Sequence, residues 1–160
     1  MAKTLSILCA NGVNLDLLGQ REANIYGNFD LAALEKELRK LLPDVVKLSG
    51  GKEIKLEFMQ SNDESEFFEK LSASTADGFM INAGAWTHTS LALADRLRAI
   101  SKPFVEVHIS NISAREEFRK HSFTAPHAAG VTYGFGMDSY VVALVGLARA
   151  LQNPKQKPKA

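Results

Sequence analysis

The stretch Gly78–Ser110, "GFMINAGAWTHTSLALADRLRAISKPFVEVHIS", holds two short apolar runs on either side of a helical pattern. Both runs, Gly78–Ala83 and Pro103–Ser110, have the length and composition of buried strands. Residues 88–101 between them place leucine and alanine at helical spacing, and a proline follows the end of that pattern. A strand, a helix and a second strand in this order predict two parallel strands with a helix packed over them.

The same alternation runs through the rest of the chain. Three more strands are predicted at Thr4–Ala10, Ile54–Gln60 and Ala129–Gly136. Helices are predicted at residues 30–43, 63–75 and 138–152, with one or two helical turns at residues 113–122. We expect Pro43 to end the first helix, so that "DVVKLSGGKE" (44–53) becomes a surface insertion, and Asp138 or Ser139 to cap the last helix.

Five short apolar strands separated by helices predict an α/β fold. The expected architecture is flavodoxin-like, a five-stranded parallel sheet of order 2-1-3-4-5 with helices on both faces. In such sheets ligands bind beyond the carboxyl ends of the strands, where the strand order reverses. Residues just after the first, third and fourth strands are therefore expected to face a ligand.

Composition limits the class of protein. The chain has 160 residues, of which 46% are apolar and 23% charged. These values predict one soluble domain, residues 1–152, followed by a basic and disordered tail, 153–160. No apolar run approaches the roughly 20 residues of a membrane helix. The one cysteine, Cys9, excludes an internal disulfide and a cysteine-rich metal site, and it fits a cytoplasmic protein.

The charge balance indicates no nucleic-acid partner. The formal net charge is +1, and three lysines lie in the tail "NPKQKPKA". Without those three positive charges the rest of the chain carries −2. A body this close to neutral lacks the basic surface that phosphate backbones require.

Polar side chains gather at the three strand ends that the fold assigns to a ligand. They are Asn11, Asn14, Arg21 and Tyr26 after the first strand, Asn82, Gly84 and His88 after the third, and Glu106, His108, Ser110, Asn111, Arg115 and Arg119 after the fourth. Each has an ordinary structural explanation; the hydroxyls around His88, for example, fit a helix cap. Their convergence on one edge of the sheet favours a ligand site.

Several chemistries lack their motifs. There is no G-x-G-x-x-G or Walker A phosphate loop and no G-x-S-x-G nucleophile elbow. His88 and His108 lack the spacing of a zinc pair. No lysine has the strand-end apolar setting that suits a Schiff base. The remaining Tyr, His, Arg, Asn and Ser residues suit acid–base chemistry on a small, hydroxylated and anionic substrate.

Five motifs in order give a specific resemblance. They are "NGVNLDLLGQREANIYG", "QSNDESEF", "INAGAWTHTSLALADRL", "VEVHISNISAREEFRKHS" and "AGVTYGFGMDSY". Together they resemble the type II 3-dehydroquinate dehydratases from about Thr4 to Leu151. The resemblance implies reversible dehydration of 3-dehydroquinate to 3-dehydroshikimate, no cofactor or metal, and a homododecamer built as a tetramer of trimers.

The resemblance also implies catalytic roles. Tyr26 matches the base that removes a proton beside the ketone, and a nearby cation, Arg21 or Arg115, would lower the pKa of its phenol. Asn14 matches the residue that holds a water against the enolate oxygen. His108 matches the general acid, and Glu106 would set the charge and orientation of the imidazole.

Binding positions carry over in the same way. Asn82, His88 and Arg119 match residues that hold substrate hydroxyls, Ile109 and Ser110 match those that receive the carboxylate, and Asp95 matches one that reaches the site from a neighbouring subunit. Arg115 counts among the substrate-binding residues as well. Val13 and Ala23 stand where the family usually has proline, which removes a restriction on φ in the loop.

Two alternatives remain. One is a non-catalytic flavodoxin-like module that binds a small molecule. A flavin module, however, would carry a Ser/Thr/Gly-rich phosphate loop after the first strand, and a receiver module would carry paired acids there. The other is an enzyme acting on a related cyclic hydroxy-ketone acid. The residues also do not distinguish aromatic biosynthesis from quinate breakdown.

Overall fold

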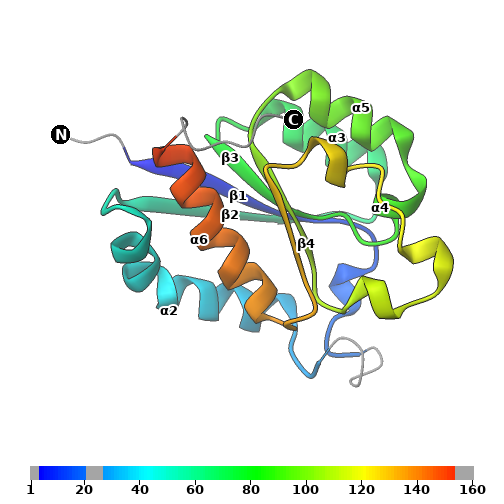
Figure 1. Ribbon diagram of the computed structural model, residues 1–160, viewed down its shortest axis with the longest axis horizontal. Helices are drawn as coiled ribbons and strands as arrows, with labels where there is room; N and C mark the ends of the chain where they lie inside the picture. Colours follow the sequence, from blue (N-terminus) through cyan, green and yellow to red (C-terminus); the bar gives the residue numbers. More distant parts are fainter. Residues whose placement is uncertain (1–3, 21–26, 154–160) are drawn as a thin grey trace.

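The computed structural model describes residues 4–20 and 27–153. Its five parallel strands form one sheet in the order β2-β1-β3-β4-β5, as predicted (Figure 1). The strands are β1 (Leu5–Asn11), β2 (Ile54–Gln60), β3 (Gly78–Asn82), β4 (Phe104–His108) and β5 (Gly130–Tyr133). The α/β, flavodoxin-like architecture expected from the sequence is therefore confirmed.

Four long helices cover the two faces of the sheet. Helices α2 (Leu31–Ser49) and α6 (Asp138–Gln152) lie on one face, and α3 (Glu64–Ala73) and α5 (Leu91–Ile100) lie on the other (Figure 1). Short helical turns occupy the connections: η1 (Leu15–Leu17), α4 (Trp86–Thr89), η2 (Ile112–Ala114), η3 (Glu117–Arg119) and η4 (Ala125–His127). No helix of the described residues combines the length and apolar character that crossing a membrane requires.

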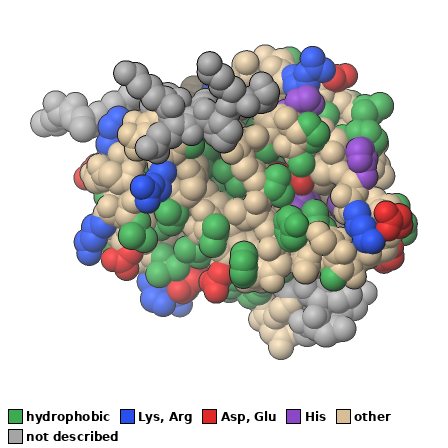
Figure 2. All heavy atoms as spheres, in the orientation of Figure 1, with side chains coloured by type: hydrophobic (Ala, Val, Ile, Leu, Met, Phe, Trp, Pro, Cys, Tyr) green, Lys and Arg blue, Asp and Glu red, His purple; other side chains and the backbone are tan. Residues whose placement is uncertain are grey.

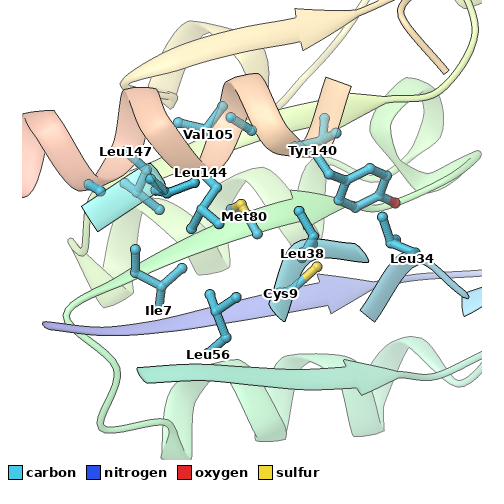
Figure 3. Packing of buried hydrophobic residues seen from close by; sticks show 14 of the residues in the cluster. Ile7, Cys9, Leu34, Leu38, Leu56, Met80, Val105, Tyr140, Leu144 and Leu147 are labelled. Carbon is cyan, nitrogen blue, oxygen red and sulfur yellow. The ribbon is translucent and has the colours of Figure 1, made fainter. Parts of the chain in front are cut away.

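The sheet separates two hydrophobic cores. Alternate residues of a strand face opposite sides, so Ile7 and Cys9 of β1 join the core under α2 and α6, while Leu8 joins the core under α3 and α5. Figure 3 shows Tyr140 and Leu144 of α6 packed over the first of these cores. Apolar packing therefore covers both faces of the sheet, and the polar side chains lie at the strand ends.

Helix α2 does not end at Pro43, and that prediction was wrong. The helix continues through the proline to Ser49 and ends at Gly50, whose φ of 115° lies in the left-handed region. Pro43 cannot donate a backbone hydrogen bond, but it lies on the exposed side. Val45 and Ser49 continue the buried stripe beyond it, so packing outweighs the lost bond. Residues 44–49 are therefore helix and not a surface insertion.

The last two predicted helices also differ in detail. The pattern at 88–101 divides at Ser90, whose side chain accepts a hydrogen bond from the Leu93 N–H and caps α5. Neither Asp138 nor Ser139 caps α6, because the N-cap residue is Met137 and it makes no side-chain cap. The Ser139 hydroxyl instead accepts the Phe135 N–H at 3.1 Å.

Strand register places the polar ends together at one edge. Asn11, the last residue of β1, lies opposite Gln60 of β2 and Asn82 of β3. The chain then passes through Gly12, where a Cβ would lie 2.6 Å from the Ala83 carbonyl oxygen. Figure 2 shows charges of both signs scattered over one face of the molecule, with no large patch of either sign.

Candidate active site

A pocket opens at the carboxyl edge of the sheet, beyond β1, β3 and β4. Its lining residues are Val13, Asn14, Leu15, Asn82, Gly84, Ala85, His88, His108, Ile109, Ser110, Ile112, Arg115 and Arg119. Nine of them are residues that the sequence placed at the ligand site: Asn14, Asn82, Gly84, His88, His108, Ile109, Ser110, Arg115 and Arg119. The fold therefore brings together side chains that lie more than one hundred residues apart in the chain.

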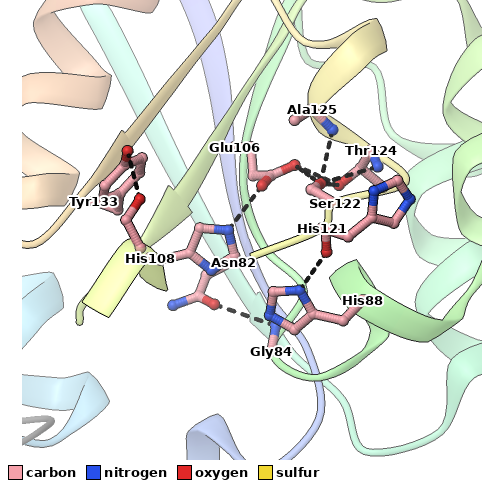
Figure 4. Close-up of polar contacts among 11 residues, drawn as sticks. Asn82, Gly84, His88, Glu106, His108, His121, Ser122, Thr124, Ala125 and Tyr133 are labelled. Atoms are coloured by element: carbon pink, nitrogen blue, oxygen red, sulfur yellow. Dashed lines mark hydrogen bonds and ion pairs between the residues drawn. The ribbon is translucent and has the colours of Figure 1, made fainter. Parts of the chain in front are cut away.

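His108 and Glu106 form a buried pair on β4. The His108 Nε2 atom lies 2.8 Å from Glu106 Oε1, and both side chains are almost fully excluded from solvent (Figure 4). The two residues are two apart on a strand, so both point to the same side of the sheet. With Nε2 engaged by the carboxylate, Nδ1 is the ring nitrogen left for a ligand in the pocket.

Glu106 is held as an anion inside the protein. Burial by itself would raise the pKa of this carboxyl, but the hydrogen bond and charge of His108 and the hydroxyls of Thr124 and Ser122 outweigh burial and lower the pKa below its ordinary value. Ser122 Oγ donates to Glu106 Oε2 at 2.8 Å, and Thr124 Oγ1 donates to the same oxygen. A carboxylate fixed in this way accepts the His108 Nε2–H and holds the ring in one orientation.

His88 presents its second ring nitrogen as a hydrogen-bond acceptor. Its Nδ1 lies 2.7 Å from the His121 carbonyl oxygen, which can only accept, so Nδ1 carries the proton. Burial lowers the pKa of His88 and outweighs the His121 hydrogen bond, which raises it. The ring stacks on that of His108 with centroids 6.0 Å apart. A neutral His88 therefore suits a substrate hydroxyl donating to Nε2.

Asn82 is held by a buried polar network. Its Nδ2 donates to the Tyr140 hydroxyl at 2.7 Å, and that hydroxyl donates to Asn11 Oδ1 at 2.7 Å. Asn82 Oδ1 accepts the Gly84 N–H at 3.2 Å. Asn11 thus turns toward Tyr140 and does not line the pocket, contrary to the expectation that it faces a ligand. Asn11 does lie at the carboxyl end of β1, but its side chain bonds the Tyr140 hydroxyl, which in turn bonds Asn82.

The loop that follows β1 is anchored where it passes the pocket. Asn14 has a φ of 65°, in the left-handed region, and its N–H donates to Asn62 Oδ1 at 2.7 Å. Gln60 Nε2 donates to the same oxygen at 3.0 Å and to the Gly12 carbonyl at 3.2 Å. Leu15 is buried in the core. The first part of this loop is therefore fixed on both sides of Asn14.

Two arginines give the pocket a positive rim. Arg115 and Arg119 both approach Glu116, with Nε–Oε2 distances of 3.3 and 3.1 Å. Arg115 Nη1 also donates to Ser110 Oγ at 3.3 Å. Both guanidinium groups therefore lie beside Glu116 where they line the pocket. Guanidinium groups suit an anionic ligand.

Of the described residues that the sequence singled out, Asn11, Asp95, Glu106 and Asn111 do not line the pocket. Asp95 lies on the outer surface of α5, where Arg98 Nη1 donates to it at 3.4 Å and its side chain is 75% exposed. Arg21 and Tyr26 fall outside the described residues, as do Ala23 and the tail beyond Asn153. Among the described residues, no group of three or more His, Cys, Asp or Glu side chains could hold a metal ion.

Sequence reasoning missed several residues of the site. Ser122 and Thr124 bind Glu106, Tyr140 binds Asn82, and Asn62 binds the Asn14 backbone. Ser122, Tyr140 and Asn62 lie inside motifs that carry the family resemblance, respectively "EEFRKHS", "MDSY" and "QSNDESEF". No local pattern assigns a role to a hydroxyl or amide whose partner lies far along the chain.

Comparison with known families decides the identity. The model of the family described as Dehydroquinase class II matches residues 5–148. The chain belongs to the class II dehydroquinase family. The resemblance drawn from the motifs is thereby confirmed, and the chain is an enzyme, a hydro-lyase of the type II 3-dehydroquinate dehydratase kind.

Relatives of this class II dehydroquinase match nearly its whole length. It is 48% identical over 149 residues to a 3-dehydroquinate dehydratase of Prochlorococcus marinus subsp. pastoris. The matched residues make up 92% of this chain and 97% of the relative. A Synechococcus 3-dehydroquinate dehydratase is 45% identical over 150 residues, with the same two coverages. The type II dehydroquinase of Butyrivibrio crossotus superposes with a TM-score of 0.81 at 38% identity, covering 90% of this chain and 97% of that one.

Proposed function

We propose that the pocket carries out reversible dehydration of 3-dehydroquinate to 3-dehydroshikimate through an enolate, with Tyr26 as base and His108 as general acid. The observation that carries this proposal is the buried His108–Glu106 pair, which opens on a pocket with a positive rim. Dehydration needs a proton donor where the hydroxyl leaves. An imidazole held against a buried carboxylate is suited to that step.

The other lining residues suit the substrate's polar groups. Asn82 and neutral His88 offer a fixed amide and a ring acceptor for hydroxyls, and Arg119 offers a cation beside them. The Ile109 and Ser110 backbone and the Ser110 hydroxyl, beside Arg115, are proposed to receive the carboxylate. Binding a hydroxylated, anionic ring requires hydrogen-bond donors, acceptors and cations of these kinds.

The residues proposed as the base, Tyr26, and as the holder of a water at the enolate oxygen, Asn14, both follow β1 in the sequence. A free tyrosine phenol has a pKa near 10, so a tyrosine that acts as base at neutral pH needs a cation beside it. Arg21 follows Asn14 by seven positions in the sequence, and Arg115 lines the pocket. Asn14, held by Asn62, is proposed to fix a water against the enolate oxygen as charge develops there.

The deciding experiment follows turnover directly. Purified protein mixed with 3-dehydroquinate should produce the near-ultraviolet absorbance of an enone, without added metal or nucleotide. Tyr26→Phe and His108→Asn should each lower kcat by roughly 10²–10⁴-fold while leaving the far-ultraviolet circular dichroism unchanged. A Tyr26→Phe variant with wild-type kcat would remove Tyr26 as the base.

Two further measurements separate the alternatives. Borohydride added with substrate should leave activity intact, because the enolate route forms no imine; rapid inactivation would show a Schiff base instead. A related cyclic hydroxy-ketone acid turned over faster than 3-dehydroquinate would reassign the substrate. Both outcomes leave the pocket as an active site and change only its chemistry.

The assembly is part of the same proposal. Asp95 is exposed on α5 and lies outside the pocket of its own chain, as a residue that serves a neighbouring subunit would. We therefore propose a homododecamer, a tetramer of trimers, in which Asp95 completes the next site. Light scattering after gel filtration should give the mass of twelve chains, and Asp95→Asn should raise KM without changing that mass.

A further inference from the structure

A short segment between η3 and η4 contacts His88 and the carboxylate partner of His108. The His121 carbonyl accepts the His88 Nδ1–H at 2.7 Å, and the hydroxyls of Ser122 and Thr124 reach Glu106, the partner of His108 (Figure 4). The Phe123 N–H donates to the Thr87 carbonyl at 3.0 Å and ties the segment to α4. Residues 121–124 therefore hold the His88 ring directly and bind the carboxylate that holds the His108 ring.

The direction of the hydrogen bonds around Ser122 is determined by its backbone neighbours. Ser122 Oγ accepts the Thr124 N–H at 3.2 Å and the Ala125 N–H at 2.9 Å. A hydroxyl has two lone pairs and one hydrogen, so both lone pairs are in use and the hydrogen remains for Glu106 Oε2. Thr124 Oγ1 donates to the same carboxylate oxygen.

This arrangement determines the state of His108. An anionic carboxylate has no proton to donate, so Glu106 Oε1 accepts from His108 Nε2, and Nε2 carries a hydrogen. A proton that the ring releases into the pocket must then leave from Nδ1. Without the two hydroxyls, Glu106 would lose two of the donors that hold its charge and its rotamer inside the protein.

We propose that Ser122 and Thr124 are positioning residues that fix the Glu106 carboxylate and, through it, hold His108 with Nε2 bound and Nδ1 facing the substrate. The inference rests on the proposed role of His108 as general acid. Neither hydroxyl belongs to the pocket lining, so neither acts on substrate directly. The same segment fixes the proton of His88 on Nδ1 through the His121 carbonyl.

The kinetic test removes the hydroxyls one at a time and together. Ser122→Ala and Thr124→Val should each lower kcat about tenfold, a part of the roughly 10²–10⁴-fold that general acid catalysis supplies, with KM within about twofold of wild type. The double variant should lose more kcat than either single variant. Thr124→Ser keeps the hydroxyl and should restore most of the kcat lost in Thr124→Val.

A matched control comes from η2, the short helix that follows β4. Ser113→Ala removes an exposed hydroxyl that bonds Tyr133 at 3.1 Å and touches neither histidine. This variant should keep wild-type kcat and KM. A loss in Ser113→Ala equal to that in Ser122→Ala would overturn the proposal, because it would show that any lost hydroxyl near β4 has the same effect.

A spectroscopic readout separates this inference from the proposed function. The ¹⁵N signals of the His108 ring, assigned by their absence from His108→Asn, should show a proton fixed on Nε2 in wild type and a mixture of tautomers in the double variant. Unchanged ring signals and unchanged kcat in the double variant would overturn the positioning role. If wild type fails to dehydrate 3-dehydroquinate, the proposed function falls, while the ring signals still decide the positioning.

Discussion

The Tyr140 hydroxyl on α6 lies 2.7 Å from the Asn82 amide at the end of β3, although the two residues are 58 positions apart in the chain. The contact is fully buried, and the same hydroxyl donates onward to Asn11. Burial raises the pKa of Tyr140 well above its ordinary value, so this phenol stays protonated and remains a donor. The Tyr140 hydroxyl therefore connects the core under α2 and α6 to Asn82, which lines the pocket.

Tyr140→Phe should weaken both stability and substrate binding. The change leaves Asn11 Oδ1 and Asn82 Nδ2 buried without this partner, which costs about 1–3 kcal/mol of unfolding free energy. KM should rise several-fold, because the Asn82 amide loses the contact that orients it. Urea unfolding and steady-state kinetics measure the two effects. Tyr133→Phe, which removes an exposed hydroxyl on β5, is the control and should change neither.

Gly12→Ala and Gly146→Ala should act in opposite directions. A Cβ at Gly12 would lie 2.6 Å from the Ala83 carbonyl oxygen, so β1 and β3 must separate at their polar ends, at a cost of about 1–3 kcal/mol. A Cβ at Gly146, inside α6, meets nothing within 4 Å, so alanine should stabilise the helix by about 0.5–1 kcal/mol. Urea midpoints compare the two. Equal effects would contradict the close approach at Gly12.

Asn62→Ala should lower kcat because it releases the Asn14 backbone. Asn62 Oδ1 accepts both the Asn14 N–H and Gln60 Nε2, and Asn14 holds a left-handed φ of 65°. Without this hydrogen bond, the Asn14 backbone would sample other conformations. Because Asn14 would then be a less firmly placed donor, kcat should fall about tenfold or less. Asn62→Asp keeps the accepting oxygen and should retain most activity. Equal loss in both variants would argue against this anchor.

Glu106→Gln should change how stability depends on pH. The pKa of Glu106 is lowered in the folded protein, so the folded state binds its proton less tightly than the unfolded chain does. Its contribution is therefore fully present above the ordinary carboxyl pKa of about 4.3 and is lost as pH falls through the lower folded value. Wild type should exceed Glu106→Gln in urea midpoint at pH 6, and the gap should narrow toward pH 3. A constant gap would contradict the pKa shift.

Periodicity predicted the strands well because it is a local property. The stretch Ile54–Gln60 was predicted as a strand with the bounds that the structure has, and the five strands appear in the predicted order. A buried strand or a helix face repeats every few residues, so its signal lies within a short window of sequence. The strand order was expected because five short strands in about 150 residues suit the flavodoxin-like arrangement.

Pro43 shows where local signals fail. Proline within a helix removes one hydrogen bond, and this cost is visible in sequence. The opposing gain is not visible there: Leu34, Leu38 and Val45 share one buried stripe that continues past the proline against the core. A helix continues when the area it buries outweighs one lost bond, and only the packed structure gives that area.

The sequence by itself determined the fold class, the edge of the sheet that holds the pocket and most of the residues that line it. These depend on periodicity and on residue types at strand ends, which are readable along the chain. Tertiary structure alone decided which polar atoms meet: Ser122 and Thr124 on Glu106, and Tyr140 on Asn82. Hydrogen bonds require partners within about 3 Å in a defined direction, and distant segments reach that geometry only after the chain has packed.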